Sequence, residues 1–143
     1  MNLLDEVDKI KKDRYSEANA EVKLCQDIII KAISQSSLNR NVTIKGGVVM
    51  RSLSKNARRA TQDLDLDFIR FSIFEESIGI FIEKLNCIDG IRLRMSAPIE
   101  ELKHQDYKGK RIHIEISDDF GNVVQLHKTL KKVYCSNTMK RYI

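Results

Sequence analysis

Between residues 62 and 69 the chain alternates acidic and apolar side chains, and this pattern limits the possible folds more than any other feature. The alternating residues are Asp63, Leu64, Asp65, Leu66, Asp67 and Phe68. A period of two is typical of a β-strand, whose successive side chains point to opposite faces. The segment therefore predicts a strand with one acidic and one apolar face, and the apolar face predicts a sheet packed on a core.

Hydrophobic periodicities elsewhere predict helices and further strands. We expect helices within about 3–38, 48–55 and 74–85, and strands at 42–45, 91–95, 112–116 and 123–126. A break near Tyr15 divides the first helical region, and Ser16 is suited to cap the second helix. The strands at 91–95 and 112–116 are expected to pair in antiparallel fashion across the polar stretch between them.

Together these elements predict one α/β (α+β) domain over residues 1–143, with a mixed β-sheet flanked by helices. Its expected parts are N-terminal helices at about 3–38, a core at about 42–127 and a basic polar tail at about 128–143. The 143 residues, 42% of them hydrophobic and 31% charged, suit a single globular domain rather than a disordered or fibrous chain.

The composition also favours a cytoplasmic protein with polyanionic partners. The chain has no apolar run of about 18 residues and no apolar signal-peptide region near Met1, so we expect no membrane association. Its three cysteines are far apart and form no CxxC pair, which indicates reduced thiols rather than a disulfide or zinc site. The net charge of +5 favours nucleic acid or nucleotide phosphates as partners, with solvated lysines as the alternative.

The acidic strand and the double glycine before it are the features that predict chemistry. Residues two apart on a strand share a face at about 6.5–7 Å, so Asp63 and Asp65 can both reach a pair of Mg²⁺ ions about 3.5–4 Å apart. The alternative is an edge strand whose acidic face lies in water. Gly46 and Gly47 stand between a predicted strand and a predicted helix, where backbone N–H groups can approach a phosphate.

A third carboxylate is available on the strand predicted at 112–116. Glu115 lies on its polar face, where it can complete a metal site and accept a proton from an attacking hydroxyl. The alternative is an exposed strand glutamate. His113 shares this face and can contact a substrate, although a lone histidine is more often a surface residue.

A double glycine, a helix and then an acid-x-acid strand resemble the signature of the DNA polymerase β-like nucleotidyltransferase superfamily. More narrowly, the chain is similar to the AbiEii/AbiGii-type toxin nucleotidyltransferases, the toxin half of bacterial abortive-infection toxin–antitoxin systems. The matching residues are Lys45, Gly46, Gly47, Arg59, Thr61, Asp63 and Asp65. The resemblance extends loosely from the helix near Glu21 to the strand near Leu126.

The resemblance implies a nucleotidyltransferase-like core that transfers NMP from an NTP to an acceptor hydroxyl with the help of Mg²⁺ (or Mn²⁺). It also implies the 3′ end of a tRNA as the acceptor, and an antitoxin protein as a partner. Family members usually continue into a helical region that supplies further functional residues. The alternative is therefore a truncated, catalytically inactive module of this fold that binds nucleotide, RNA or a partner protein.

Residue by residue, the resemblance implies a metal site next to a phosphate site. The implied metal ligands are Asp63 and Asp65, with Glu115 as the third carboxylate, and the implied contacts of the NTP phosphates are Gly46, Gly47, Arg59 and Thr61. Thr61 would orient a phosphate or a metal-bound water, and Arg59 would steady the triphosphate. Asp67 lies on the same strand face but outside the matched pair, and we expect it to be peripheral.

Overall fold

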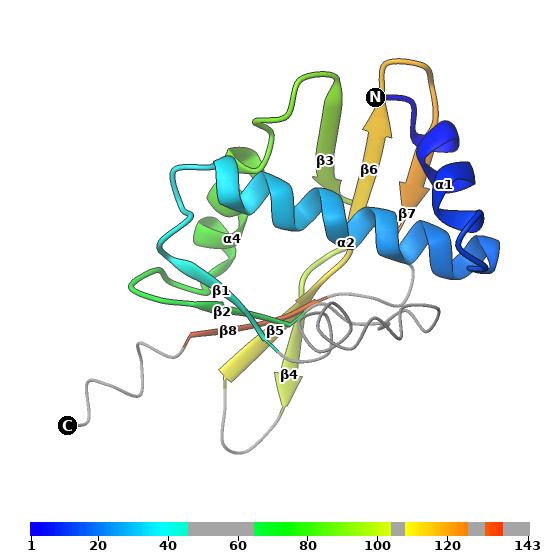
Figure 1. The fold of residues 1–143 in the computed structure, drawn as a ribbon. Coiled ribbons are helices and arrows are strands. Elements are labelled where there is room, and N and C mark those ends of the chain that lie inside the picture. Colours follow the sequence, from blue (N-terminus) through cyan, green and yellow to red (C-terminus); the bar gives the residue numbers. More distant parts are fainter. Residues whose placement is uncertain (46–64, 104–107, 126–130, 136–143) are drawn as a thin grey trace.

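The computed structural model describes residues 1–45, 65–103, 108–125 and 131–135, and within these ranges the protein is a mixed α+β fold (Figure 1). The described helices are α1 (Leu3–Lys11), α2 (Glu17–Gln35) and α4 (Glu75–Lys84). The described strands are β1 (Val42–Lys45), β2 (Asp65–Phe68), β3 (Ile91–Met95), β4 (Glu100–Lys103), β5 (Lys108–Ile112), β6 (Ile114–Asp118), β7 (Val123–Gln125) and β8 (Lys131–Cys135). None of the described helices is long and apolar enough to cross a membrane.

The two N-terminal helices form as the sequence predicts, with a break before Ser16. The Ser16 side chain accepts a hydrogen bond from the Asn19 N–H at 3.1 Å, which satisfies one of the free donors at the start of α2. Arg14 has a positive φ of 70°, a conformation that ends the turn after α1 and redirects the chain. The predicted cap and break are therefore confirmed.

The start of α1 is hydrogen-bonded to the carboxylate of Asp118, the last residue of β6. The Leu3 N–H donates to Asp118 Oδ2 at 2.7 Å, and Asp118 also accepts bonds from the backbone N–H groups of Phe120 and Asn122. Burial alone would raise the pKa of Asp118, but these bonds and one from the Asn122 side chain outweigh it and lower the pKa to about 2. The carboxylate is therefore ionised at neutral pH and holds the start of α1 at the end of β6.

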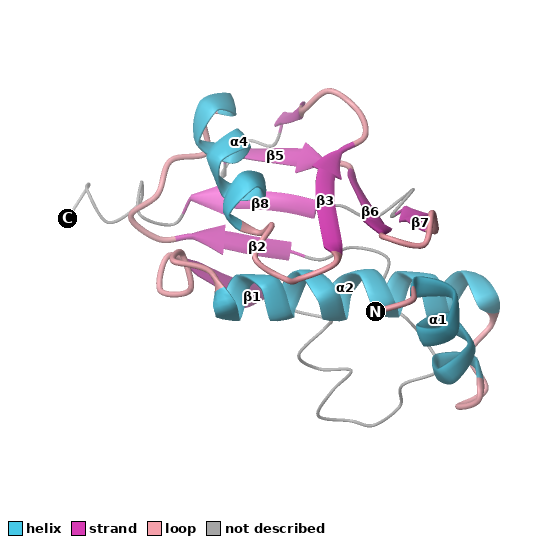
Figure 2. Cartoon of the chain, turned by 90° about the horizontal axis from the view of Figure 1, so that it is seen from above, coloured by secondary structure: helices cyan, strands magenta, loops and turns pink. Residues whose placement is uncertain are grey.

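Five strands form the larger sheet, in the order β1-β2-β8-β5-β4 (Figure 2). The β2–β8 pair is parallel, and the other neighbours in this sheet are antiparallel. As a result, one edge of the sheet carries an end of each strand. Three strands, β2, β8 and β4, start at this edge, and β1 and β5 end there. We call this the Asp65 edge, and its strand ends are Lys45, Asp65, Lys131, Ile112 and Glu100.

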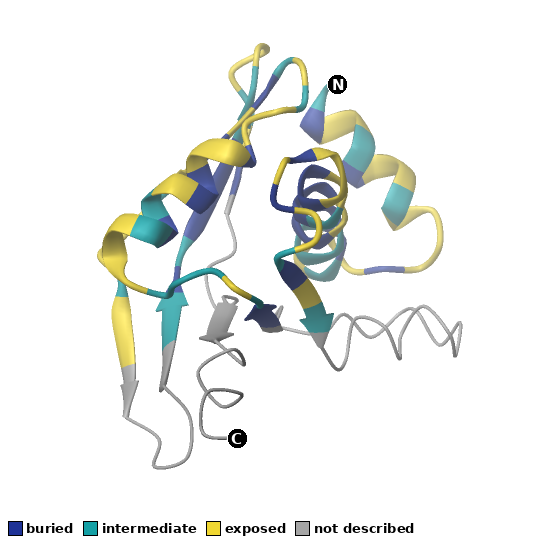
Figure 3. Ribbon diagram, turned by 90° about the vertical axis from the view of Figure 1, so that its left-hand side faces the viewer, coloured by how far each residue is buried: buried dark blue, intermediate teal, exposed yellow. Residues whose placement is uncertain are grey.

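Apolar side chains of β2 pack under the helices and hold that strand in place. Phe68 is fully buried, and its ring lies 4.9 Å from the ring of Phe81 on α4 and 5.3 Å from that of Phe71. Figure 2 shows α4 lying across β5, β8 and β2, and Figure 3 shows the buried residues gathered between the helices and the strands. The apolar face predicted for the 62–69 strand is thus confirmed for Leu66 and Phe68, both buried in the core.

A smaller antiparallel sheet, in the order β3-β6-β7, stands beside the larger one (Figure 1). The predicted antiparallel pairing is confirmed for β3 with residues from Ile114 onward, with Leu93 opposite Ile116, whereas Ile112 belongs to β5 of the larger sheet. A single residue, His113, separates the end of β5 from the start of β6. The chain therefore passes from the larger sheet into the smaller one at His113.

Three strands were not expected from the sequence. Residues 100–103 and 108–111 belong to the stretch that we predicted as a polar connection, and they form the paired strands β4 and β5. Residues 131–135 belong to the predicted polar tail, and they form β8, the central strand of the larger sheet. The core therefore extends beyond the boundary predicted at residue 127.

Candidate functional site

The predicted site residues divide between the Asp65 edge, the smaller sheet and the segments outside the described residues. Asp65 is the first residue of β2, and Glu115 is the second residue of β6. The predicted residues outside the described ranges are Gly46, Gly47, Arg59, Thr61 and Asp63, together with the helix predicted at 48–55. Of the matched motif, the structure thus describes the two strand ends that flank this segment.

Those two strand ends lie side by side. Lys45, the last residue of β1, is directly opposite Asp65 in the antiparallel β1–β2 pair. Opposed residues in such a pair have Cα atoms about 4.5–5.5 Å apart. Gly46 comes after Lys45 in the sequence, so the double glycine begins directly after the residue that lies opposite Asp65.

The acidic strand is not a solvated edge strand, and that alternative is wrong. β2 lies between β1 and β8 in the strand order. Asp67, opposite Thr43 in β1, is only 7% exposed. Burying a carboxylate costs free energy unless hydrogen bonds or opposite charge compensate it. Asp67 is thus a buried carboxylate of the same strand as Asp65, and its place at the periphery of the site stays a prediction.

Glu115 is buried in the smaller sheet and pairs with an arginine. It is 8% exposed and forms an ion pair with Arg94, which lies opposite it on β3. The hydrogen bond and the negative charge of Glu115 raise the pKa of the Arg94 guanidinium above its ordinary value. The alternative of an exposed strand glutamate is therefore wrong. Among the described residues no group of three potential ligand side chains is gathered as a metal site, and the Asp63 and Asp65 side chains lie outside that description.

A charged group that sequence reasoning missed lies at the Asp65 edge. His113 Nε2 and Glu100 Oε2 are 2.6 Å apart, and Glu100 lies directly opposite Arg111 in the β4–β5 pair. The hydrogen bond from His113 lowers the pKa of Glu100 against the opposing effect of burial, and the charges of His113 and Arg111 lower it further. The contacting residues are 13 positions apart in the sequence and belong to a hairpin that we did not predict, so no local signal pointed to the pair.

The register of the larger sheet shows how this group relates to the acidic strand. One row of opposed residues runs across four strands: Leu66 on β2, Val133 on β8, Lys110 on β5 and Glu101 on β4. Asp65, Arg111 and Glu100 each lie next to this row on the side of the Asp65 edge. Two strand spacings of about 4.8 Å separate β2 from β5, so Arg111 and Asp65 are about 10 Å apart through their backbones.

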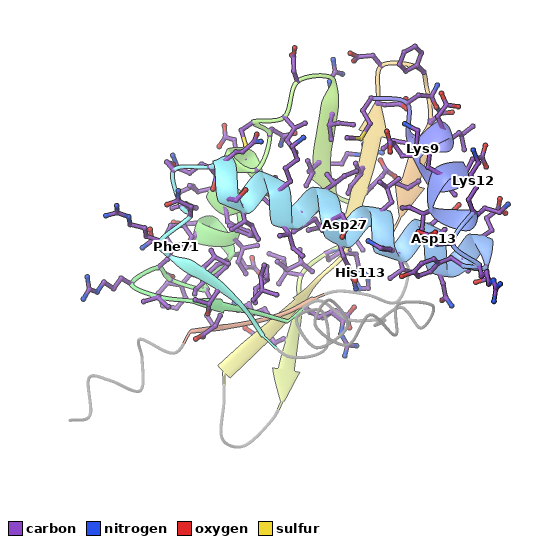
Figure 4. All side chains as sticks on the ribbon, in the orientation of Figure 1. Lys9, Lys12, Asp13, Asp27, Phe71 and His113 are labelled. Carbon is purple, nitrogen blue, oxygen red and sulfur yellow. The ribbon has the colours of Figure 1, made fainter. Side chains whose placement is uncertain are left out.

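His113 lies just beyond the end of β5, at the same edge. In Figure 4 it lies below α2, where the chain turns from β5 into β6. It is about four-fifths buried, whereas Glu100 is half exposed. The described part of the site is therefore a sheet edge that brings together the flanks of the glycine–aspartate segment, a histidine–carboxylate pair and an arginine.

Comparison of the chain with models of protein families, with curated proteins and with solved structures gives no match. The case for a function therefore rests on the chemistry of the residues described above and on the motif in the sequence.

Proposed function

We propose that this protein is a metal-dependent nucleotidyltransferase that transfers NMP from an NTP to an acceptor hydroxyl. The observation that carries the proposal is the pairing of Lys45 with Asp65. It brings the strand that leads into the double glycine next to the strand that bears the aspartates. A phosphate-contacting turn beside paired carboxylates is what nucleotidyl transfer requires, because the triphosphate and its cations must be bound together.

The residues present fit the chemistry of Mg²⁺. The donor set consists of carboxylates, the hard oxygen ligands that this cation prefers together with substrate phosphates. Asp63 and Asp65 would hold it, with Glu115 as the third carboxylate, and when bound it would neutralise charge on the transferring phosphoryl group. Carboxylates crowded on one strand face without a cation would repel one another.

The other roles follow the motif. Gly46 and Gly47 would present backbone N–H groups to the triphosphate, and Arg59 and Thr61 would contact the phosphates from the segment before Asp63. By resemblance to AbiEii-type toxins, the acceptor would be the 3′ end of a tRNA, and an antitoxin protein would bind the enzyme. The net charge of +5 suits a nucleic-acid acceptor.

Label transfer from α-³²P-labelled NTPs to a tRNA pool in the presence of Mg²⁺ tests the proposal. The parent chain should label RNA, and Asp63→Ala or Asp65→Ala should abolish labelling, because each change removes a proposed metal ligand. Asp8→Ala is a matched control, since Asp8 is an exposed acid on α1, and it should label RNA as the parent does. Equal labelling by the Asp63→Ala/Asp65→Ala double variant and the parent would exclude the assignment.

The Arg94–Glu115 ion pair favours a second candidate, a nucleotidyltransferase-fold module that binds without turnover. A cation that uses Glu115 must displace the guanidinium or share the carboxylate with it. Calorimetry with NTP and Mg²⁺ separates the two candidates when it is combined with the labelling assay. Binding of NTP without transfer to any RNA in the pool would support the module.

A further inference from the structure

Apolar side chains gather on the surface where the start of α1 meets the turn between β6 and β7. Six large apolar side chains of the described residues are exposed, and four of them come from these two segments. Each of the four is between 44% and 66% exposed, and we call them the N-terminal patch: Met1, Leu4, Phe120 and Val123. Exposed apolar residues that are scattered singly are normal, whereas a group of them is typical of an interaction site.

Hydrogen bonds join the two segments that carry the patch. Asn122 Nδ2 donates to Asn2 Oδ1 at 3.1 Å, and the Leu3 N–H donates to Asp118 Oδ2 at 2.7 Å. Asp118 also accepts a bond from the Phe120 N–H, which fixes the turn. Figure 1 shows the N-terminus beside this turn. The N-terminal patch is therefore held in place before a partner binds, and this lowers the entropic cost of binding.

The surroundings of the patch are acidic, although the chain as a whole is basic. The first eight residues and residues 118–123 together contain five acidic side chains and no basic one, whereas the net charge of the chain is +5. Three of these acids are exposed and form no ion pair within the described part of the chain: Asp5, Asp8 and Asp119. Asp119 directly precedes Phe120, and Asp8 follows Leu4 by one helical turn, so carboxylates lie next to the apolar side chains.

This charge indicates the kind of partner. A second copy of the chain docked by two-fold symmetry would bring the same acids face to face, and nucleic acid or an anionic membrane would be repelled as well. A polypeptide with lysine or arginine beside its apolar side chains has the complementary charge. We propose that the N-terminal patch binds a polypeptide segment in which apolar side chains are flanked by lysine or arginine.

The residues of the patch contribute unequally to such a contact. Phe120 should contribute most, because aromatic side chains are enriched among the residues that dominate binding energy. Arg92 lies across Ser117 from Val123, two strand spacings or about 10 Å away, and so limits the acidic surroundings on that side. The proposal does not depend on the proposed function, since binding is measured without any reaction.

Selection of random dodecamer peptides from a displayed library on the full chain, followed by fluorescence anisotropy with the enriched peptides, tests the proposal. The enriched peptides should combine lysine or arginine with apolar residues. Phe120→Ser and Leu4→Ser should each weaken binding by about tenfold or more. Asp119→Lys should weaken it by about two- to fivefold, an effect that becomes smaller at high salt. The matched controls, Phe74→Ser and Glu83→Lys, replace an exposed phenylalanine and an exposed acid elsewhere and should bind as the parent does.

Every replaced side chain is exposed, so each variant should keep the circular dichroism spectrum of the parent. Three outcomes would overturn the proposal. In the first, the selection enriches no peptide whose binding is weakened by Phe120→Ser. In the second, the peptides that depend on the patch are neutral or acidic. In the third, the parent sediments as a dimer that Phe120→Ser dissociates, because a second copy of the chain would then occupy the patch.

Discussion

Phe81 is the main aromatic contact between α4 and the acidic strand, and its truncation gives a sharp test of the packing. Its side chain is fully buried, and its ring lies 4.9 Å from that of Phe68 in β2. Replacement of a buried Phe by Ala typically costs about 3–5 kcal/mol, from lost burial and the cavity left behind. The loss of the ring pair accounts for about 0.5–1.5 kcal/mol of this cost.

We therefore expect Phe81→Ala to lower the free energy of unfolding by about 3–5 kcal/mol, a large share of the roughly 5–15 kcal/mol of a typical domain. With a urea dependence of about 2 kcal/mol per molar, the midpoint of unfolding should move down by about 1.5–2.5 M. Urea titration followed by circular dichroism at the helical band measures this shift.

The matched control is the phenylalanine that directly precedes the same helix. Phe74 caps the start of α4 without a side-chain hydrogen bond and is 74% exposed, so Phe74→Ala should change the free energy of unfolding by less than about 0.5 kcal/mol. A Phe81→Ala cost under about 1 kcal/mol, or equal costs for the two variants, would refute the packing of α4 on β2 described here.

Three further predictions concern Asp118 at the end of β6 and the glycines Gly79 and Gly121. Because the pKa of Asp118 is about 2 in the folded protein, below its ordinary value of 3.8, its stabilising effect is complete above about pH 4 and is lost as the pH falls through 2. Urea midpoints measured from pH 5 to pH 2 should therefore fall more steeply for the parent than for Asp118→Asn, and parallel curves would contradict this. Gly79→Ala should stabilise the protein by about 0.5–1 kcal/mol, because a Cβ there meets nothing within 4 Å in the middle of α4. Gly121→Ala should destabilise it by about 1–2 kcal/mol, because Gly121 has a φ of +84°, and thermal melts of the two variants should shift in opposite directions.

Elements with a strong apolar period could be predicted from the sequence. The apolar residues of the 74–85 segment, spaced three and four apart, predicted the buried face of α4, and Ile78, Phe81 and Leu85 are fully buried there. The strand at 42–45 was predicted with the boundaries that it has in the structure. In these segments the local pattern and the final packing agree, so the sequence alone was sufficient.

The strands that were missed lack such a period. β4, β5 and β8 read Glu-Glu-Leu-Lys, Lys-Gly-Lys-Arg-Ile and Lys-Lys-Val-Tyr-Cys, and charged residues occupy adjacent positions on both faces. Their extended conformation depends on pairing with strands far away in the chain, and β propensity depends strongly on such context. The same cause hid the His113–Glu100 pair, because only the β4–β5 hairpin brings these residues together.

For the site, the sequence predicted the residue types better than their surroundings. The strand position of Asp65 and its closeness to the end of the 42–45 strand follow from the motif and agree with the β1–β2 pair. The partner of Glu115 did not follow, because alternation along one strand says nothing about the arginine opposite on another. The roles of Asp63, Gly46, Gly47, Arg59 and Thr61 remain predictions of the motif.

The central place of β8 has a consequence for synthesis of the chain. Both β2 and β5 are hydrogen-bonded to β8, so without β8 the larger sheet divides into two separate strand pairs, β1–β2 and β5–β4. The aspartate strand belongs to one pair and Glu100 to the other, and β8 joins them. A chain that lacks β8 cannot join the two strand pairs, so any activity at the Asp65 edge requires the chain to be synthesised through Cys135.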